Sequence, residues 1–551
     1  MIVLGICDGH DSGACLLQDG EILHAVSAER LTRCKRQPGF PQYAIQECLH
    51  STGIPWEDID LVAVAEKAGR AAFRVLDSWY RRTDPNQPML RPTNRLARAY
   101  HRAANATAWT RNLDESISGS ALKSRLEKIG CRRPLVFIEH HLAHLASALM
   151  WSGMKAPLVM SIDAYGDGSS GAAATYDTAA GTWKVLERFS MDRSPAQFFG
   201  AVASLLGFPE GEEGKVSALA PKAAADKPLE MLHDAMGLQG IISVHHLVPV
   251  AGRILKEFGR NALAAAAQAV IEESITGQVT GLMKAAGVDE LAIAGGVFAN
   301  VGVNGALSRI PGLKDLFVFP HMGDGGLCAG AAAAAMLQRG VQLQPRLKHV
   351  FLGAGFEQDQ IDGAIGESGL KLAKTKDNLE RVSVMLDDGK VIGMFRGKAE
   401  FGPRALGHRS ILFSARDPEL PAKVSRMIQR DPVMPFAPAT RSGDFGSLYD
   451  AGPAMNCAPF MTAAFAARDA ALEHAPTGVH ADNTSRAQLV ESDLLPELHA
   501  LLDTQPAGTL INTSFNMHKE PIVHTPQDAL RTFAESGIDA LWMGDSLVVR
   551  Q

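Results

Sequence analysis

One repeated unit constrains the fold of the N-terminal part of this chain more than any other feature. Apolar runs at Ile2–Cys7, 158–162, 291–294 and 316–319 each end in a glycine-rich turn that carries polar side chains. Helical patterns alternate with these runs, which predicts an open α/β sheet that binds ligands at the carboxyl ends of its strands. Two such halves facing one cleft would hold a nucleotide between them. The residues that this pattern places at strand ends are Asp8, His10, Asp163, Gly295, Gly296 and Asp324.

Two histidines, His140 and His144, lie four residues apart in the segment EHHLAH. This spacing puts both imidazoles on one face of a helix. Together with Asp163 and Asp324 they would form a mixed nitrogen and oxygen shell that suits Fe(II), Mn or Zn. The alternative is an ordinary helix contact, which is the commoner explanation for such a pair taken alone.

Length and composition indicate a large globular protein. A chain of 551 residues is too long for one core and predicts two to four domains. The net charge of -6 gives no general attraction to nucleic acid or anionic membranes, so we expect neither as a partner. Seven scattered cysteines without a CxxC pair argue against a disulfide framework and favour a reducing cytoplasm. The chain begins directly with an apolar run and shows no signal-peptide pattern, which also favours a cytoplasmic enzyme.

Local patterns predict individual elements and one boundary. Asp19-Gly20 predicts a hairpin turn, and residues 262–285 read as a helix capped by Asn261. A domain boundary is expected near residues 342–354. Residues from about 67 to 126 are rich in arginine and proline; a solvated surface insertion is the favoured interpretation, and a basic wall for an acidic partner is the alternative.

Several motifs, taken together and in order, resemble the NodU/CmcH family of O-carbamoyltransferases. The resemblance covers nearly the whole chain. The motifs are HDSGA (10–14), AERLTR (28–33) with Phe40-Pro41, HHLAH (140–144), GKV (214–216) with LAP (219–221), GGVFAN (295–300), GDGG (323–326), FGPRALGHRS (401–410), HADNTSR (480–486) and NTSFN (512–516).

The resemblance implies a fold class and an activity. Residues 1–345 would form a domain of the ASKHA (actin-like ATPase) superfold, similar to Kae1, and residues 355–551 a YrdC-like α/β domain. In this family the second domain joins carbamoyl phosphate and ATP, with Mg, into carbamoyl adenylate. The first domain then passes the carbamoyl group to a hydroxyl group, here expected on a small specialised metabolite such as an antibiotic precursor.

The resemblance also implies roles for individual residues. His10 corresponds to the catalytic histidine and would act as a general base. The metal ligands, with Fe(II) expected, would be His140, His144, Asp163 and Asp324, with His141 a neighbour. Gly295, Gly296 and Asn300 would accommodate the nucleotide. Carbamoyl phosphate and ATP would be bound in the second domain by Arg396, Lys398, Arg404, Arg409, Arg430, Arg486, Asn512, Thr513 and Ser514.

One stretch departs from the family pattern. Ile428 stands near a position that is usually lysine, and Met434 replaces an arginine. Three explanations stay open: Lys423 or Arg426 substitutes, the first half-reaction is slow, or the donor differs from carbamoyl phosphate. Alternative functions are a related transferase that acts on tRNA and a non-catalytic scaffold with a decayed adenylate site. A homodimer is compatible with the sequence, which does not determine the oligomeric state.

Overall fold

The computed structural model describes residues 1–67, 70–75, 99–100, 103–104, 106–220, 225–237, 242–370, 372–373 and 378–550. Its N-terminal domain contains two five-stranded sheets with matching strand orders, β3-β2-β1-β4-β5 and β8-β7-β6-β9-β10. In each sheet the first three strands are antiparallel and the last two pairings are parallel. This duplicated arrangement is the one expected of an ASKHA domain, so the predicted fold class is confirmed. The strands are β1 (Ile2–Cys7), β2 (Gly13–Gln18), β3 (Glu21–Ser27), β4 (Leu61–Ala65), β5 (Leu135–Ile138), β6 (Leu158–Gly166), β7 (Ser169–Asp177), β8 (Thr182–Phe189), β9 (Glu290–Ala294) and β10 (Asp315–Val318).

Two helices pack in the core that joins the two sheets, α6 (His140–Met150) and α13 (Leu327–Leu337). Almost every residue of both helices is buried, and α13 also contacts β1. Small residues permit this close packing, since a side chain at Gly330 would collide with the carbonyl of Ala143 on α6. The small residues of α13 are therefore a packing requirement.

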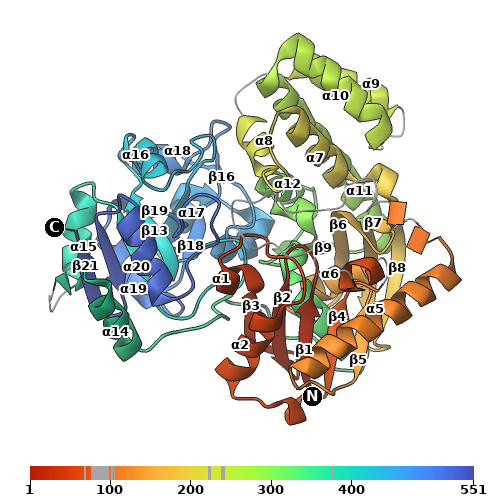
Figure 1. The fold of residues 1–551 in the computed structure, drawn as a ribbon. Helices are drawn as coiled ribbons and strands as arrows, with labels where there is room; N and C mark the ends of the chain where they lie inside the picture. Colours follow the sequence, from red (N-terminus) through yellow and green to blue (C-terminus); the bar gives the residue numbers. More distant parts are fainter. Residues whose placement is uncertain are drawn as a thin grey trace.

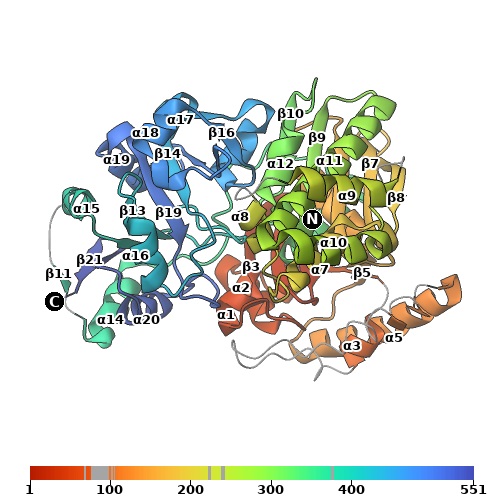
Figure 2. The same cartoon turned by 90° about the horizontal axis from the view of Figure 1, so that it is seen from above.

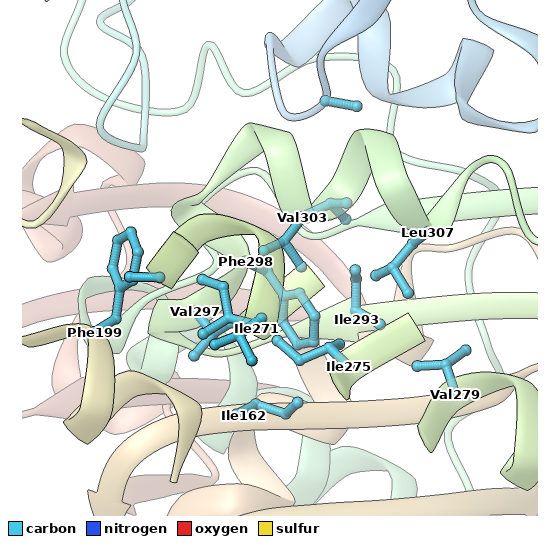
Figure 3. Close-up of a cluster of buried hydrophobic side chains, with 14 of the residues drawn as sticks. Ile162, Phe199, Ile271, Ile275, Val279, Ile293, Val297, Phe298, Val303 and Leu307 are labelled. Carbon is cyan, nitrogen blue, oxygen red and sulfur yellow. The ribbon is translucent and has the colours of Figure 1, made fainter. Parts of the chain in front are cut away.

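The second half of this domain is covered by a helical layer around α11 (Arg260–Ala286) (Figure 3). Ile271 and Ile275 of this helix pack with Val297 and Phe298, which lie directly after β9. The prediction that Asn261 caps the helix is wrong. The N-cap residue is Gly259, whose φ of 85° is a conformation that glycine adopts without strain. The other helices of this layer are α7 (Pro195–Leu205), α8 (Gly214–Leu219), α9 (Asp226–Met236), α10 (Val244–Phe258) and α12 (Val301–Leu307).

The described helices of the arginine-rich insertion lie on the side of the molecule away from the second domain (Figure 2). Residues 68–69, 76–98, 101–102 and 105 fall outside the described residues. The parts that are described form α3 (Ala71–Val75) and α5 (Ala108–Lys128), which begins with a capping box between Thr107 and Thr110. Both described segments are therefore helical. The remaining elements of the first domain are α1 (Ala28–Thr32), α2 (Gln42–Thr52), η1 (Trp56–Asp58), η3 (Met191–Arg193), η5 (Gly296–Ala299) and η6 (Asp324–Gly326).

The second domain, teal to blue in Figure 1, is built on an eight-stranded mixed sheet of order β11-β21-β20-β12-β13-β19-β14-β18. Two separate hydrophobic clusters fill its core. The strands of this sheet are β11 (Leu372–Ala373), β12 (Ile392–Phe395), β13 (Arg409–Ser414), β14 (Ala437–Arg441), β18 (Gln488–Val490), β19 (Thr509–Ser514), β20 (Ala540–Met543) and β21 (Ser546–Val549). The helices are α14 (Gln358–Ser368), α15 (Asn378–Asp387), α16 (Leu420–Met427), α17 (Ser442–Leu448), η7 (Gly452–Phe460), α18 (Asp469–His474), η8 (Pro476–Gly478), α19 (Pro496–Asp503), η9 (Pro506–Gly508) and α20 (Pro526–Glu535).

The core around α11 extends across the predicted boundary into the later part of the chain. Phe445, Cys457 and Phe465 belong to the same hydrophobic cluster as α11. They lie in or beside a small three-stranded sheet of β15 (Tyr449–Asp450), β16 (Phe465–Ala467) and β17 (Thr484–Ser485). The division at residues 345 and 355 stays a prediction, and the two parts share one continuous core.

A buried polar triad also joins the two parts. The Glu47 carboxylate on α2 contacts Nε2 of His24 at 3.0 Å and Nε2 of His524 at 2.9 Å. Burial alone would raise the pKa of Glu47, but the hydrogen bonds from both histidines outweigh burial and lower that pKa to about 2.

We expect Glu47→Gln to lower the melting temperature at neutral pH, because a charge-assisted contact worth ~1.5–3 kcal/mol is weakened. A carboxylate whose pKa is lowered by folding stabilises the folded state fully at pH values above its pKa in the unfolded chain. This stabilisation is lost as the pH falls toward 2. The difference between wild type and variant should therefore shrink below pH ~4.5. Melting curves at a series of pH values measure it, with the exposed Glu57→Gln as the control. Equal melting temperatures for Glu47→Gln and wild type at pH 7 would contradict this account.

Candidate active sites

Four side chains of the first domain meet as the sequence predicted. His140 and His144 lie on one face of α6, Asp163 lies within β6, and Asp324 lies in η6 between β10 and α13. Nε2 of His144 lies 3.4 Å from Asp163 Oδ2 and 3.5 Å from Asp324 Oδ1, and Nε2 of His140 lies 3.7 Å from Asp324 Oδ1. One ligand atom from each of the four residues lies within 4.8 Å of the others.

The polar atoms of this cluster fit a metal ion. Nε2 of His140, Nε2 of His144 and Oδ1 of Asp324 are buried and have no hydrogen-bond partner. Buried polar atoms without partners are rare because they lose their hydration, so a bound cation is the natural partner for three that converge. Two imidazole nitrogens and two carboxylates form a donor set suited to Fe(II), Mn or Zn. His141 differs, since its ring nitrogens contact the Ser169 carbonyl and the Ser161 hydroxyl.

A second layer of contacts orients His140. Its Nδ1 lies 3.2 Å from Glu66 Oε1, and its backbone N–H donates to Asp167 at 2.8 Å. Carboxylates behind a histidine ligand fix its ring and raise its basicity. Gly166 leaves room for the ring, because a Cβ atom at this position would overlap the His140 imidazole.

We expect Gly166→Ala to displace the His140 ring and to lower metal affinity by ~10- to 100-fold, in the range seen when the support of a ligand is disturbed. Metal titration of the purified variant measures this loss. Gly200→Ala is the matched control, because its Cβ atom enters open space on α7. Unchanged metal affinity in Gly166→Ala would show that His140 is not a ligand in this position.

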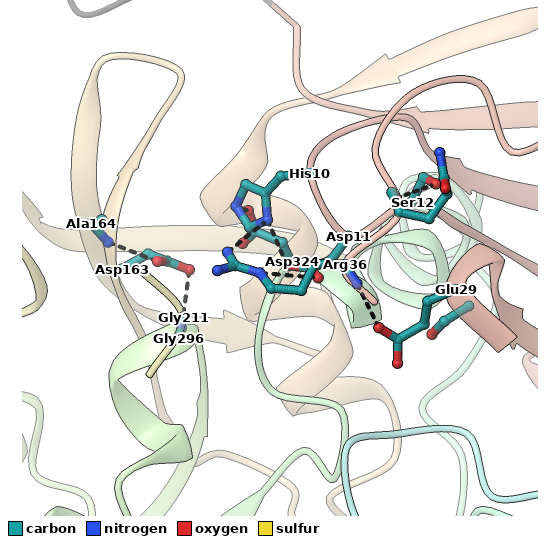
Figure 4. A network of polar contacts seen from close by, with 12 residues as sticks. His10, Asp11, Ser12, Glu29, Arg36, Asp163, Ala164, Gly211, Gly296 and Asp324 are labelled. Atoms are coloured by element: carbon teal, nitrogen blue, oxygen red, sulfur yellow. Dashed lines mark hydrogen bonds and ion pairs between the residues drawn. The ribbon is translucent and has the colours of Figure 1, made fainter. Parts of the chain in front are cut away.

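His10 lies directly beside the four-residue cluster (Figure 4). Its Nε2 is 2.9 Å from Asp324 Oδ2, its Nδ1 is 2.5 Å from Asp11 Oδ2, and Arg36 approaches the same Nδ1 at 3.3 Å. Burial alone would lower the pKa of His10, but Asp11 and Asp324 outweigh burial and raise it to about 9. A cation held by Asp324 would offset that carboxylate's charge and so favour the neutral imidazole that a base requires.

The glycine loop after β9 holds Asp163 in place. The N–H of Gly296 donates to Asp163 Oδ2 at 3.0 Å, and Gly295 has a φ of 113° where a side chain would collide with the Ile162 carbonyl.

Asn300 caps α12, and its side-chain amide also forms a hydrogen bond with Gln268. A nucleotide contact by Gly295, Gly296 and Asn300 stays a prediction.

Three predicted arginines of the second domain, Arg404, Arg430 and Arg486, are half-buried and lie close enough together to interact electrostatically. Burial lowers the pKa of Arg404 and of Arg430 to about 10, and Arg404 lowers that of Arg430 further. Burial also lowers the pKa of Arg486 well below its usual value, with further lowering by the other two. Nε of Arg404 and Nε of Arg486 are buried without a partner. Among the described residues no carboxylate forms an ion pair with any of the three, so the cluster is suited to an oxyanion.

The remaining predicted residues of this domain have mixed surroundings. Arg396 pairs with Glu497 at 2.8 Å, and Lys398 is exposed. Arg409 is fully buried and donates to backbone carbonyls, including Gly397 at 3.1 Å, so it is no surface ion-pair residue.

The three predicted residues of β19 differ in their contacts. Thr513 accepts a hydrogen bond from Arg430 at 2.8 Å. Asn512 bonds the Gln488 side chain and the Ala405 carbonyl, and Ser514 pairs with Ser410 in the sheet.

The two unusual residues have different surroundings. Ile428 is buried in the core of the second domain, while Met434 approaches Gly214 of the first domain. Of the proposed substitutes, Lys423 lies near Asp539 and Arg426 is exposed. Lys215, from the GKV motif, reaches Asp431 at 2.8 Å.

Comparisons with known proteins identify the family. A family model described as carbamoyltransferase N-terminus matches residues 2–333, and one described as carbamoyltransferase C-terminus matches residues 383–550. The chain belongs to the carbamoyltransferase family. It is therefore an enzyme, as predicted, and the resemblance to the NodU/CmcH proteins is confirmed.

The chain is similar in sequence to several known proteins. The chain is 27% identical to an uncharacterized protein of Methanocaldococcus jannaschii, over 99% of both chains. It is 28% identical to nodulation protein NolNO of Sinorhizobium fredii, over 98% of this chain and 79% of that protein. It is 28% identical to the 3'-hydroxymethylcephem-O-carbamoyltransferase of Streptomyces clavuligerus, over 46% of this chain and 48% of that enzyme. In the described part of this carbamoyltransferase, no helix is long and apolar enough to cross a membrane.

Sequence reasoning missed several polar residues of the site in the first domain. Glu66 and Arg36 contact His140 and His10 from segments that carried no signal for catalysis. Asp11 stood in the HDSGA motif beside His10, and this adjacency was the one local clue to its contact.

Proposed function

We propose that this carbamoyltransferase uses ATP and carbamoyl phosphate to carbamoylate a hydroxyl group of a small specialised metabolite. Residues 355–551 would use one water molecule to release phosphate from carbamoyl phosphate, and the resulting carbamate would displace pyrophosphate from ATP to form carbamoyl adenylate. Residues 1–345 would transfer the carbamoyl group to the acceptor and release AMP. The observation that carries the proposal is the occurrence, in one chain, of a half-buried arginine cluster and a histidine–carboxylate cluster suited to a metal.

The first half-reaction needs cations that face phosphate groups. Arg404, Arg430 and Arg486 meet this need, because they are half-buried, lie near one another and form no ion pair with a carboxylate among the described residues. The Thr513 hydroxyl on β19 accepts a hydrogen bond from Arg430 and so orients its guanidinium group. Ile428 lies in the hydrophobic core and Met434 approaches Gly214 of the first domain, so the cations that the family pattern has at these positions are not replaced there.

The second half-reaction needs a base and stabilisation of negative charge at the carbamoyl carbon. His10 would accept the proton of the acceptor hydroxyl, with Asp11 and Arg36 fixing its ring. His140, His144, Asp163 and Asp324 would hold a divalent metal such as Fe(II), which supplies electrostatic stabilisation of the adenylate phosphate and of developing charge. Gly296 keeps Asp163 oriented toward this cluster.

The proposal is tested by product analysis with ATP, carbamoyl phosphate and a pool of hydroxylated metabolites. We expect pyrophosphate release that requires both substrates, and an acceptor whose mass increases by one carbamoyl group. Pyrophosphate release without carbamoyl phosphate would indicate a different acyl donor. Absence of pyrophosphate, with ATP bound, would contradict the proposed donor chemistry. Carbamoylation of tRNA instead of a small molecule would contradict the proposed acceptor class.

A further inference from the structure

The loop that carries Arg404 is held by a buried carboxylate. Oε1 of Glu400 accepts hydrogen bonds from the backbone N–H groups of Leu406, His408 and Arg409 at 2.8, 3.0 and 3.2 Å. Glu400 is only 4% exposed. Three amides on one carboxylate fix the backbone of the loop, since charge-assisted hydrogen bonds are stronger than neutral ones.

The same loop is also held from the other domain. Arg30 of α1 is 6% exposed, and its Nη2 donates to the Gly402 carbonyl at 2.7 Å. Gly402 lies two residues before Arg404 and has a φ of 146°, a conformation that other residues rarely adopt. The loop therefore has little freedom on either side of Arg404.

We propose that Arg30, a residue of the first domain, is a positioning residue for the anion site of the second domain. Arg404, Arg430 and Arg486 repel one another, so their convergence depends on a rigid backbone. Arg404 itself reaches back to the Ala299 carbonyl at 3.4 Å, at the glycine loop of the first domain. The hydrogen bond from Arg30 therefore helps to hold Arg404 in the position that phosphate binding requires. This gives Arg30 of the AERLTR motif a structural function. This inference rests on the proposed function of the arginine cluster.

Arg33 provides a matched control at the same interface. It also crosses from the first domain, donating to the Ile522 and Pro521 carbonyls at 2.8 and 2.7 Å. Those carbonyls belong to a segment that carries none of the three clustered arginines. Arg30→Met and Arg33→Met each remove one arginine and its interdomain contacts while retaining a long apolar side chain.

The test measures the affinity of the full-length variants for inorganic pyrophosphate by calorimetry. We expect binding about tenfold weaker in Arg30→Met, since one charge-assisted hydrogen bond no longer restrains the loop, and wild-type affinity in Arg33→Met. The KM for carbamoyl phosphate in adenylate formation should rise by a similar factor in Arg30→Met. Transfer from supplied carbamoyl adenylate should keep its wild-type rate, which a merely local role of Arg30 in the first domain would not predict.

Unchanged pyrophosphate affinity in Arg30→Met, or an equal loss in both variants, would overturn the inference. If Arg30→Met fails to fold, Glu400→Gln tests the loop from the opposite side, and we expect weaker binding there as well; wild-type affinity in that variant counts against the inference. A wild-type protein that binds pyrophosphate but forms no adenylate would contradict the proposed function alone. A wild-type protein that binds no pyrophosphate would contradict both.

Discussion

Replacement of His144 by alanine is expected to abolish carbamoyl transfer while adenylate formation continues. His144 contributes one of the buried, unpartnered nitrogen atoms of the metal cluster, so its loss leaves three ligands and removes the metal. Without the cation, negative charge that develops during transfer loses its main stabilisation, and we expect a fall in rate of ~10³-fold or more. The arginine cluster lies in the other domain and should be unaffected.

Metal content and the two half-reactions are measured on the same preparation after anaerobic loading with Fe(II). His141→Gln serves as the control, because His141 contacts Ser161 and the Ser169 carbonyl and lies outside the cluster. We expect this control to bind metal in wild-type amount. Full metal content and normal transfer in His144→Ala would show that the cluster is not the working metal site.

Replacement of Arg486 by methionine is expected to suppress adenylate formation and, at the same time, to stabilise the fold. Arg486 is half-buried, its Nε is buried without a partner and two other cations lie near it, so its charge costs free energy until an anion binds. Loss of two charge-assisted hydrogen bonds of ~1.5–3 kcal/mol each would slow adenylate formation by at least ~10²-fold. Methionine fills a similar volume without the desolvation cost, so the melting temperature should rise.

Pyrophosphate release and thermal melting, measured together, test this pairing of lost activity with gained stability. Arg468→Met is the control, since Arg468 is 52% exposed and lies 3.9 Å from Asp450. It should change neither quantity. A lower melting temperature in Arg486→Met would mean that the arginine is structural and that its buried position stabilises the fold.

The parts of the fold that the sequence predicted depend on local patterns. Apolar runs followed by glycine turns located the strand ends of the first domain, because burial and chain reversal are both determined by neighbouring residues. Helical spacing placed His140 and His144 on one face of α6, where the structure has them. Asp163 and Asp324 were found because each follows an apolar run, although β6 does not end at Asp163 as predicted but continues to Gly166.

The parts that could not be predicted depend on contacts between distant segments. Arg30 and Gly402 are 372 residues apart, and Glu47 and His524 are 477 residues apart, so no local pattern signals either contact. Asn261 was expected as a cap because asparagine favours that position, but the φ of 85° required there selected Gly259. The packing of Phe445 and Phe465 against the core around α11 could not be predicted either, since the sequence does not show which element a hydrophobic residue packs against.

The central claim is that the second domain makes an activated carbamoyl group for use in the first. Its most direct test is a single-turnover reaction of the Fe(II)-loaded protein with ATP and ¹³C-labelled carbamoyl phosphate, without acceptor and under anaerobic conditions. The account predicts labelled carbamoyl adenylate on the enzyme, together with pyrophosphate and phosphate. Bound ATP and carbamoyl phosphate that persist unchanged, with the metal in place, would contradict it.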